Sequence, residues 1–193
     1  MDTSNYEKFQ TGNPVVRRLI DRFYGRVAEE IADLKPVAVL DAGCGEGESL
    51  ERLGQFLPDT VTGVDLNPES VEFTRQRIPG GDFQVADLLA LPFPDDSFDL
   101  VFCLEVLEHI PIPGAALAEL ARVCRGDLVL SVPSEPWFRL GSLARGKYLD
   151  GWGNHLEHVN HWNPRSLEQF LATRFESPVV RRSTPWLLGH CRV

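Results

Sequence analysis

Short apolar segments alternate with amphipathic segments along most of this sequence. The apolar segments are rich in β-branched or aromatic residues and cover residues 37–41, 61–65, 83–86, 98–104 and 127–132. Strands that are apolar on both faces are typical of parallel sheets with a layer of helices on each side. Because helical patterns separate these segments, we expect βαβ units. The alternation therefore predicts an α/β fold built on a parallel sheet.

The dipeptide Asn-Pro precedes three of the predicted helices, at residues 13–14, 67–68 and 163–164. Asparagine caps free backbone N–H groups, and proline fits the first helical position, where an N–H is not needed. Two further helices are expected over residues 49–57 and 114–125. At the C-terminus, residues 179–183 and 186–193 flank Thr184-Pro185, which predicts a closing β-hairpin. We expect one domain over residues 1–193.

The composition excludes several classes of protein. Mean hydropathy is −0.15, and no apolar run has the ~20 residues that a membrane-spanning helix needs. Residues 1–10 lack the basic and apolar regions of a secretion signal. The four cysteines form no CxxC pair, which is typical of reduced cysteines in a cytoplasmic protein. The net charge of −9 argues against a phosphate-binding surface, so we expect no nucleic-acid partner.

The most specific motif is Asp41-Ala-Gly43-Cys-Gly45-Glu-Gly47, which follows the first predicted strand. Three alternating glycines between a strand and a helix indicate a backbone that a ligand approaches closely, because a Cβ atom there would fill the ligand's space. A tight turn without a ligand is the alternative. The spacing also differs from the dinucleotide-binding pattern GxGxxG, since the third glycine comes two residues after the second.

Acidic residues also end the next two predicted strands. Asp65 lies 65 − 41 = 24 residues after Asp41, and Asp87 follows the third strand. A carboxylate at this edge of a sheet can accept hydrogen bonds from both hydroxyls of a ribose. Helix capping is the alternative for Asp65, although Asn67 already fills that role. Asp87 either accepts a hydrogen bond from an adenine amino group or is a solvated loop residue.

Three segments closely resemble the class I S-adenosylmethionine-dependent methyltransferases, in particular their type 11 branch. They are VLDAGCGEG at 39–47, GVDLNPES at 63–70 and VADLLALPFPDDSFDLVFCLEVLEHI at 85–110. The resemblance implies a Rossmann-like, doubly wound sheet of seven strands with helices on both faces. It also implies that the sheet is mostly parallel and that its last strand is antiparallel.

The same resemblance implies which residues bind S-adenosylmethionine and its product S-adenosylhomocysteine. The glycines would shape the cofactor loop, Asp41 would lie near the methionine portion, and Asp65 would hold the ribose. Residues after the third strand would lie at the adenine, and residues after the fourth would line the site. The implied cofactor-binding set is Asp41, Gly43, Gly45, Gly47, Asp65, Leu66, Asp87, Leu88, Leu104 and Glu105.

The segment Glu105-Val-Leu-Glu108-His109 has two interpretations. On adjoining turns of a short helix, Glu105, Glu108 and His109 could share a hard divalent ion. In this the segment resembles metal-dependent ubiquinone-pathway O-methyltransferases and small-RNA terminal 2′-O-methyltransferases. Many metal-free relatives also carry EVLEH, so we favour a cofactor-site or helix-capping role and assign no metal ligand.

Residues 133–163 have no counterpart in the minimal fold that the resemblance implies, and we interpret them as a substrate lid. Residues 1–35 are interpreted as an N-terminal helical cap. The lid contains His155, His158 and His161, for which three roles stay open: metal ligands, a catalytic base with its helpers, or histidines bonded to backbone. If a base is used, the candidates are His158, His161 and then His109.

These observations together predict methyl transfer from S-adenosylmethionine to a small-molecule acceptor, at oxygen or nitrogen. The short lid and acidic composition favour a small acceptor over a macromolecule. An NAD(P)-binding oxidoreductase is one alternative, because Asp65 would suit its ribose too, although the loop's glycine spacing argues against it. A non-catalytic protein that binds S-adenosylmethionine is the other. The sequence predicts neither the acceptor nor the oligomeric state.

Overall fold

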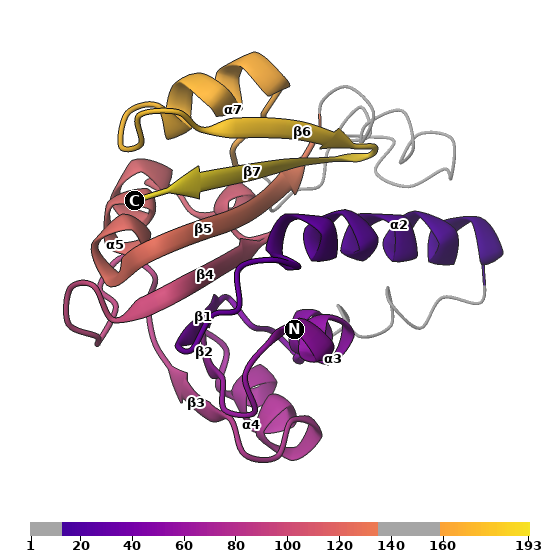
Figure 1. The fold of residues 1–193 in the computed structure, drawn as a ribbon, viewed down its shortest axis with the longest axis vertical. Helices are drawn as coiled ribbons and strands as arrows, with labels where there is room; N and C mark the ends of the chain where they lie inside the picture. The colour runs from indigo at the N-terminus through magenta and orange to yellow at the C-terminus, as the bar shows by residue number, and fades with distance from the viewer. Residues whose placement is uncertain (1–12, 135–158) are drawn as a thin grey trace.

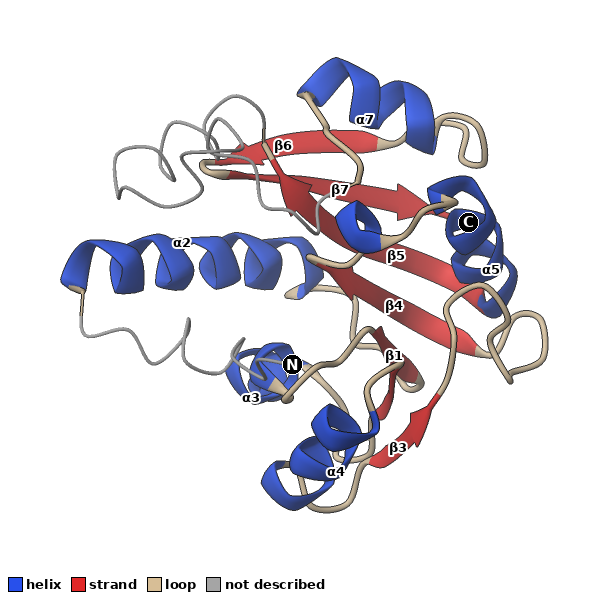
Figure 2. Cartoon of the chain, turned by 180° about the vertical axis from the view of Figure 1, so that it is seen from behind, coloured by secondary structure: helices blue, strands red, loops and turns tan. Residues whose placement is uncertain are grey.

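Seven strands form one sheet in the computed structural model, which describes residues 13–134 and 159–193 (Figures 1 and 2). The strand order is β3-β2-β1-β4-β5-β7-β6. Strands β1 to β5 pair in parallel, whereas β7 is antiparallel to both β5 and β6. The strands are β1 Val39–Ala42, β2 Thr62–Asp65, β3 Asp82–Val85, β4 Phe98–Leu104, β5 Cys124–Pro133, β6 Val179–Ser183 and β7 Trp186–Arg192. This topology confirms the predicted Rossmann-like sheet and its C-terminal hairpin.

The helices cover both faces of the sheet. Helices α2 Pro14–Ile31, α3 Glu48–Leu53 and α4 Pro68–Arg77 pack on one face, and α5 Pro113–Val123 and α7 Pro164–Leu171 pack on the other. Short 3₁₀ turns occur at η1 Gly54–Phe56 and η2 Leu107–His109. All three predicted Asn-Pro starts are confirmed, because Asn13, Asn67 and Asn163 cap α2, α4 and α7 with their side chains.

Strand β4 shows why the central strands are apolar throughout. Its Val101 and Cys103 belong to the core under α5 and α7, while Leu100 and Phe102 belong to the core under α2 and α3. All four side chains are fully buried. Successive side chains on a strand point to opposite faces, so a sheet with two covered faces needs apolar residues at every position.

Several element boundaries differ from the prediction. The helix predicted over residues 49–57 is α-helical only as far as Leu53 and continues as η1. Strand β1 begins at Val39 rather than at Val37, whose side chain is 80% exposed. The N–H groups of Val37 and Ala38 donate instead to the Asp99 carboxylate. Strand β5 begins directly after α5, at Cys124, three residues before the predicted start.

The strand order determines where a ligand can approach. From β1 the chain adds β2 and then β3 toward one edge of the sheet. It then returns to the other side of β1 with β4 and adds β5 toward the opposite edge, so the strand order reverses between β1 and β4. In open α/β sheets, ligands bind at such a switch point, outside the carboxyl ends of the strands.

No helix within the described ranges is long and apolar enough to cross a membrane. The four cysteines are buried and form no disulfide.

Candidate active site

The glycine loop joins β1 to α3 at the switch point, and its three glycines have different neighbours. All three have positive φ values, 91° for Gly43, 50° for Gly45 and 78° for Gly47. A Cβ atom on Gly43 would lie 2.4 Å from Val106 Cγ2, and one on Gly47 would lie 3.1 Å from Thr74 Cγ2. A Cβ atom on Gly45 would meet no atom of the described residues within 4 Å. We expected every glycine to leave room for a ligand, but Gly43 and Gly47 leave room for protein side chains, and only Gly45 has space beside it among residues 13–134 and 159–193.

The peptide groups of Gly45 are held from two elements. Its N–H donates to Asp65 Oδ2 over 2.9 Å, and its carbonyl accepts from the Thr74 hydroxyl over 2.6 Å. Asp65 Oδ1 accepts from the N–H of Asn67 over 2.8 Å, and Asn67 rather than Asp65 caps α4. Each carboxylate oxygen has two lone pairs, so Asp65 retains acceptor capacity for further hydroxyl donors.

Asp41 is the penultimate residue of β1, next to this loop, and is fully buried. Its Oδ2 accepts from the Ser49 hydroxyl over 2.8 Å, while its Oδ1 has no hydrogen-bond partner among the described residues. Burial raises the pKa of Asp41 to about 7, and the Asp65 charge adds to this shift, while the Ser49 hydrogen bond opposes it. A buried acceptor without a donor is costly unless a ligand supplies one. This oxygen therefore fits a cationic or hydrogen-donating group.

The residues after β2 and β3 lie at the far end of the same edge. Leu66 is 69% exposed, a large value for an apolar side chain. Asp87 is exposed, and its Oδ1 accepts from the N–H of Leu89. Leu88 is buried in the core that α5 covers. Of these predicted residues, Leu66 and Asp87 present their side chains at the surface, whereas Leu88 can contribute its backbone.

The segment after β4 is shaped by a residue on the neighbouring strand. Glu105 has a φ of 59°, which is rare outside glycine. Its N–H donates to the carbonyl of Ser131 and to the Ser131 hydroxyl, and that hydroxyl also lies 2.8 Å from Glu105 Oε1. The predicted placement of Glu105 on one short helix with Glu108 and His109 is therefore wrong. Ser131 holds Glu105 in a left-handed turn before η2, which begins at Leu107.

Glu108 and His109 are close to each other but differ in exposure. The Glu108 side chain is 1% exposed and the His109 side chain is 41% exposed, with 4.0 Å between Glu108 Oε1 and His109 Nε2. No group of three or more His, Cys, Asp or Glu side chains suited to a metal occurs in residues 13–134 and 159–193. Leu104, at the end of β4, is half-buried.

The last residues of the predicted lid are attached to this segment. Asn160 Nδ2 donates to the carbonyls of Leu107, over 3.0 Å, and Ile110, over 2.7 Å. The N–H of Val159 donates to the carbonyl of Glu108 over 2.9 Å. His161 follows this attachment and is exposed. His155 and His158 lie outside the described residues, so the structure places only His109 and His161 of the candidate bases.

Several residues that shape the site are not among the predicted site residues. Thr74 and Ser131 are fully buried polar residues, and Asn160 joins two distant segments. The sequence offers a signal for Thr74 alone, since it lies three residues after the buried Val71 on the same helix. Ser131 and Asn160 have no local pattern that distinguishes them from ordinary strand and loop residues.

Comparison with known proteins identifies the central region. Residues 40–131 match the family model described as "Methyltransferase domain". The chain is 36% identical over 130 residues to the 27-O-demethylrifamycin SV methyltransferase of Amycolatopsis mediterranei, covering 61% of this chain and 46% of that protein. It is 41% identical over 118 residues to the fatty-acid O-methyltransferase of Mycolicibacterium smegmatis, covering 59% and 43%. The chain thus spans less than half the length of these relatives.

A solved structure shares the fold over nearly the whole chain. The magnesium protoporphyrin IX methyltransferase from Synechocystis, solved with bound SAH, matches with a TM-score of 0.69 and 19% identity. The match covers 98% of this chain and 94% of that one. The family match, the curated relatives and the shared fold agree with the resemblance that the glycine loop and its acidic neighbours carry. Residues 40–131 therefore belong to the class I S-adenosylmethionine-dependent methyltransferase family.

Proposed function

We propose that this protein transfers a methyl group from S-adenosylmethionine to an oxygen atom of a small-molecule acceptor. The observation that carries the proposal is the arrangement around Gly45. Among the described residues, nothing fills the space beside its backbone and nothing donates to the buried Oδ1 of Asp41 on the preceding strand, while the Asp65 carboxylate accepts from its N–H. Such a site suits a ligand that carries both a positive charge and ribose hydroxyls.

The residues present fit S-adenosylmethionine at each part of the molecule. Asp65 would accept the ribose hydroxyls with the lone pairs that Gly45 and Asn67 leave available. Asp41 would attract the positively charged methionine portion, because ionised Asp41 lacks a compensating charge in its buried position. Leu66 and Asp87 would lie at the adenine, and Leu104 and Glu105 would line the site beyond β4. The unpartnered oxygen of Asp41 and the open face of Gly45 support this assignment.

The cofactor, when bound, supplies a methyl group that its sulfonium has already activated. The protein's part is to hold the acceptor atom in line with that group and to exclude water. An acceptor hydroxyl also needs a group to receive its proton, and His158, His161 and His109 remain the proposed candidates. A carboxylate acceptor needs no base, because it is ionised at neutral pH.

The names of the similar proteins support oxygen as the acceptor atom. Of the two curated relatives, one is named a fatty-acid O-methyltransferase, and the other is named for a 27-O-demethyl substrate. We propose that residues 133–163 form the lid over the acceptor and residues 1–35 a cap over the site, within one methyltransferase domain. The four buried cysteines suit a cytoplasmic location, and the net charge of −9 suits an acceptor other than a nucleic acid.

The test is a transfer assay with S-adenosylmethionine carrying a labelled methyl group and a panel of small hydroxyl and carboxyl compounds. We expect label to appear in at least one acceptor, in an ether or ester linkage. Amine compounds in the same panel test the nitrogen alternative. Cofactor binding without transfer to any acceptor class would favour a non-catalytic binding protein.

A further inference from the structure

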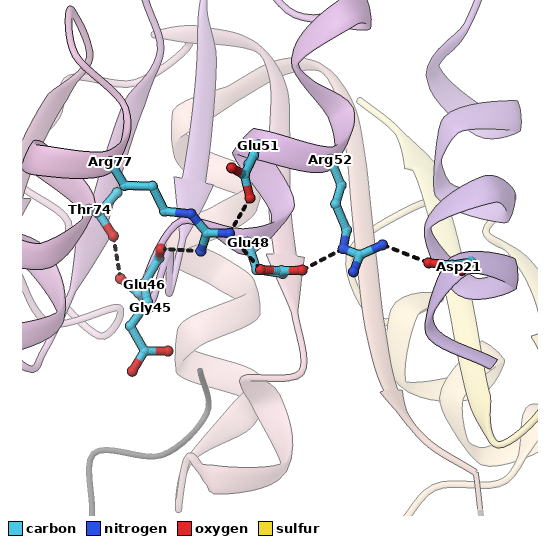
Figure 3. A network of polar contacts seen from close by, with 8 residues as sticks. All are labelled: Asp21, Gly45, Glu46, Glu48, Glu51, Arg52, Thr74 and Arg77. Carbon is cyan, nitrogen blue, oxygen red and sulfur yellow. Dashed lines mark hydrogen bonds and ion pairs between the residues drawn. The ribbon is translucent and has the colours of Figure 1, made fainter. Parts of the chain in front are cut away.

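Helix α4 contacts the glycine loop through two side chains, as Figure 3 shows. The Thr74 hydroxyl donates to the carbonyl of Gly45 over 2.6 Å, and Arg77 NH1 donates to the carbonyl of Glu46 over 2.9 Å. Thr74 is fully buried. Two consecutive carbonyls of the loop are thus fixed by residues three positions apart on one face of α4.

The same arginine connects the loop to α3. Arg77 NH2 lies 2.8 Å from Glu48 Oε2 and also pairs with Glu51. Both glutamates are on α3, which begins directly after Gly47. The Arg77 side chain is 17% exposed, and that of Glu48 is 13% exposed, so solvent screens this pair less than a surface pair.

A second arginine extends the chain of ion pairs to α2. Arg52 Nε lies 2.5 Å from Glu48 Oε1, and Arg52 NH1 lies 2.8 Å from Asp21 Oδ1 (Figure 3). The Arg52 guanidinium also lies 5.1 Å from the centre of the Tyr24 ring. Helix α3 and the loop before it are therefore held between α4 on one side and α2 on the other.

The loop needs such contacts because its own backbone is permissive. Gly45 lies at a φ of 50°, and no atom of the described residues lies within 4 Å of its Cβ position. No described side chain packs at that position, and glycine loses more conformational freedom on ordering than any other residue. Its described restraints are two hydrogen bonds, one from its N–H to Asp65 and one to its carbonyl from Thr74.

We propose that Thr74 and Arg77 are positioning residues that hold the Gly45–Glu46 backbone in its cofactor-binding form before the cofactor arrives. The inference rests on the proposed function and adds two residues outside the set that the family resemblance implies. A loop that is ordered in advance pays less conformational entropy on binding. Neither side chain needs to touch the cofactor, since both act through the loop carbonyls.

The first test measures the affinity for S-adenosylhomocysteine by calorimetry in two variants at one position. Thr74→Val keeps the shape of the side chain and removes the hydroxyl, so we expect a dissociation constant about tenfold higher, the effect of one hydrogen bond. Thr74→Ser keeps the hydroxyl, and we expect it to restore most of the affinity. In turnover with labelled cofactor, Thr74→Val should raise the KM for S-adenosylmethionine and leave kcat within about twofold.

The chain offers a matched control in Thr173, whose hydroxyl donates to the carbonyl of Phe170 over 2.6 Å at the end of α7. Thr173→Val removes the same kind of hydrogen bond away from the loop and should leave the affinity unchanged. Arg77→Met is a second, independent variant, and we expect it to weaken binding in the same direction as Thr74→Val.

Hydrogen exchange of the cofactor-free protein gives a readout that does not depend on binding. Amides of residues 43–47 should exchange faster in Thr74→Val than in the wild type and in Thr74→Ser.

If the wild type binds S-adenosylhomocysteine and both Thr74→Val and Arg77→Met bind it equally well, the positioning role is wrong and the proposed function stands. Equal loss in Thr74→Val and Thr74→Ser would assign the effect to packing and overturn the role of the hydroxyl. If the wild type does not bind, the proposed function fails and this inference fails with it.

Discussion

The two halves of the sheet's carboxyl edge are organised differently. On the β1–β2 side, the loop backbone is bonded to Asp65 and Thr74, and its charged neighbours form a continuous set of ion pairs. On the β4–β5 side, Glu105 has a left-handed backbone conformation and is bonded to Ser131. The Asn160 side chain donates to the carbonyls of Leu107 and Ile110. The loop of the first half is thus held by contacts from two helices and a strand end. The second half leads into residues 135–158 and to the histidines, where the acceptor is proposed to bind.

This contrast fits a division of labour between cofactor and acceptor. The proposed reaction has one methyl donor, so a loop that is held in one conformation suits it. Acceptors differ from one enzyme to the next, and binding residues on loops can change without disturbing the sheet. If the contrast holds, changes on the first half alter cofactor affinity and stability, and changes on the second half alter the response to the acceptor.

The largest expected effect concerns the pH dependence of stability through Asp41. The pKa of this carboxyl is about 7 in the folded protein against 3.8 in its ordinary state. Between these values the native state holds a proton that the unfolded chain has lost, so stability falls as pH rises, by about 1.4 kcal/mol for each pH unit. The free energy of unfolding, measured in urea from pH 4 to 8, should show this decline. Asp41→Asn should flatten it, and an unchanged slope would contradict the account.

The next effect concerns Gly43, which packs against the segment after β4. Gly43→Ala places a methyl group 2.4 Å from Val106 Cγ2 at a φ of 91°. We expect a loss of about 2–3 kcal/mol in the free energy of unfolding, from strain and overpacking together. Gly54→Ala is the control, because nothing lies within 4 Å of its Cβ position.

Adding Val106→Ala to Gly43→Ala separates the two causes. The double variant should recover part of the loss, because it removes the methyl groups that clash while the unfavourable φ remains. Recovery of the full loss would mean that backbone strain contributes nothing. No recovery would mean that the contact with Val106 does not cause the loss of stability in Gly43→Ala.

A smaller effect is expected on the acceptor side, at Asn160. Asn160→Ala removes the hydrogen bonds to the carbonyls of Leu107 and Ile110. We expect the KM for the acceptor to rise about tenfold, as for the loss of one or two hydrogen bonds, with the affinity for S-adenosylhomocysteine unchanged. Calorimetry and steady-state kinetics on the same preparation check both parts. An equal loss of cofactor affinity would show that the two halves are coupled.

Much of the first half could be predicted from the sequence because its signals are local. The glycines, Asp41 and Asp65 follow predicted strands, and each Asn-Pro marks a helix start within two residues. The apolar and amphipathic patterns predict the positions of β1, β2 and α4, with errors of one or two residues at the ends of these elements. In a parallel sheet, strand ends meet at one edge, so the strand pattern places Asp65 at the same edge as the loop.

The features that the sequence did not reveal all depend on contacts between distant residues. The left-handed turn at Glu105 depends on Ser131, 26 positions later, and the fixed carbonyl of Gly45 depends on Thr74, 29 positions later. Asn160 reaches Leu107 across 53 positions. No local pattern shows which distant residue each of them contacts. The spacing of Glu105, Glu108 and His109 suggested a helix that the Ser131 contact prevents.

The most direct test of the central claim is calorimetric titration of the purified protein with S-adenosylhomocysteine and, separately, with NAD. The wild type should bind S-adenosylhomocysteine and should not bind NAD. Asp65→Ala should weaken the binding of S-adenosylhomocysteine by at least about 100-fold, because two charge-assisted hydrogen bonds to the ribose are lost. Asp65→Asn, which keeps one acceptor oxygen, should fall between them. Binding of NAD, or undiminished binding of S-adenosylhomocysteine by Asp65→Ala, would contradict the proposed site.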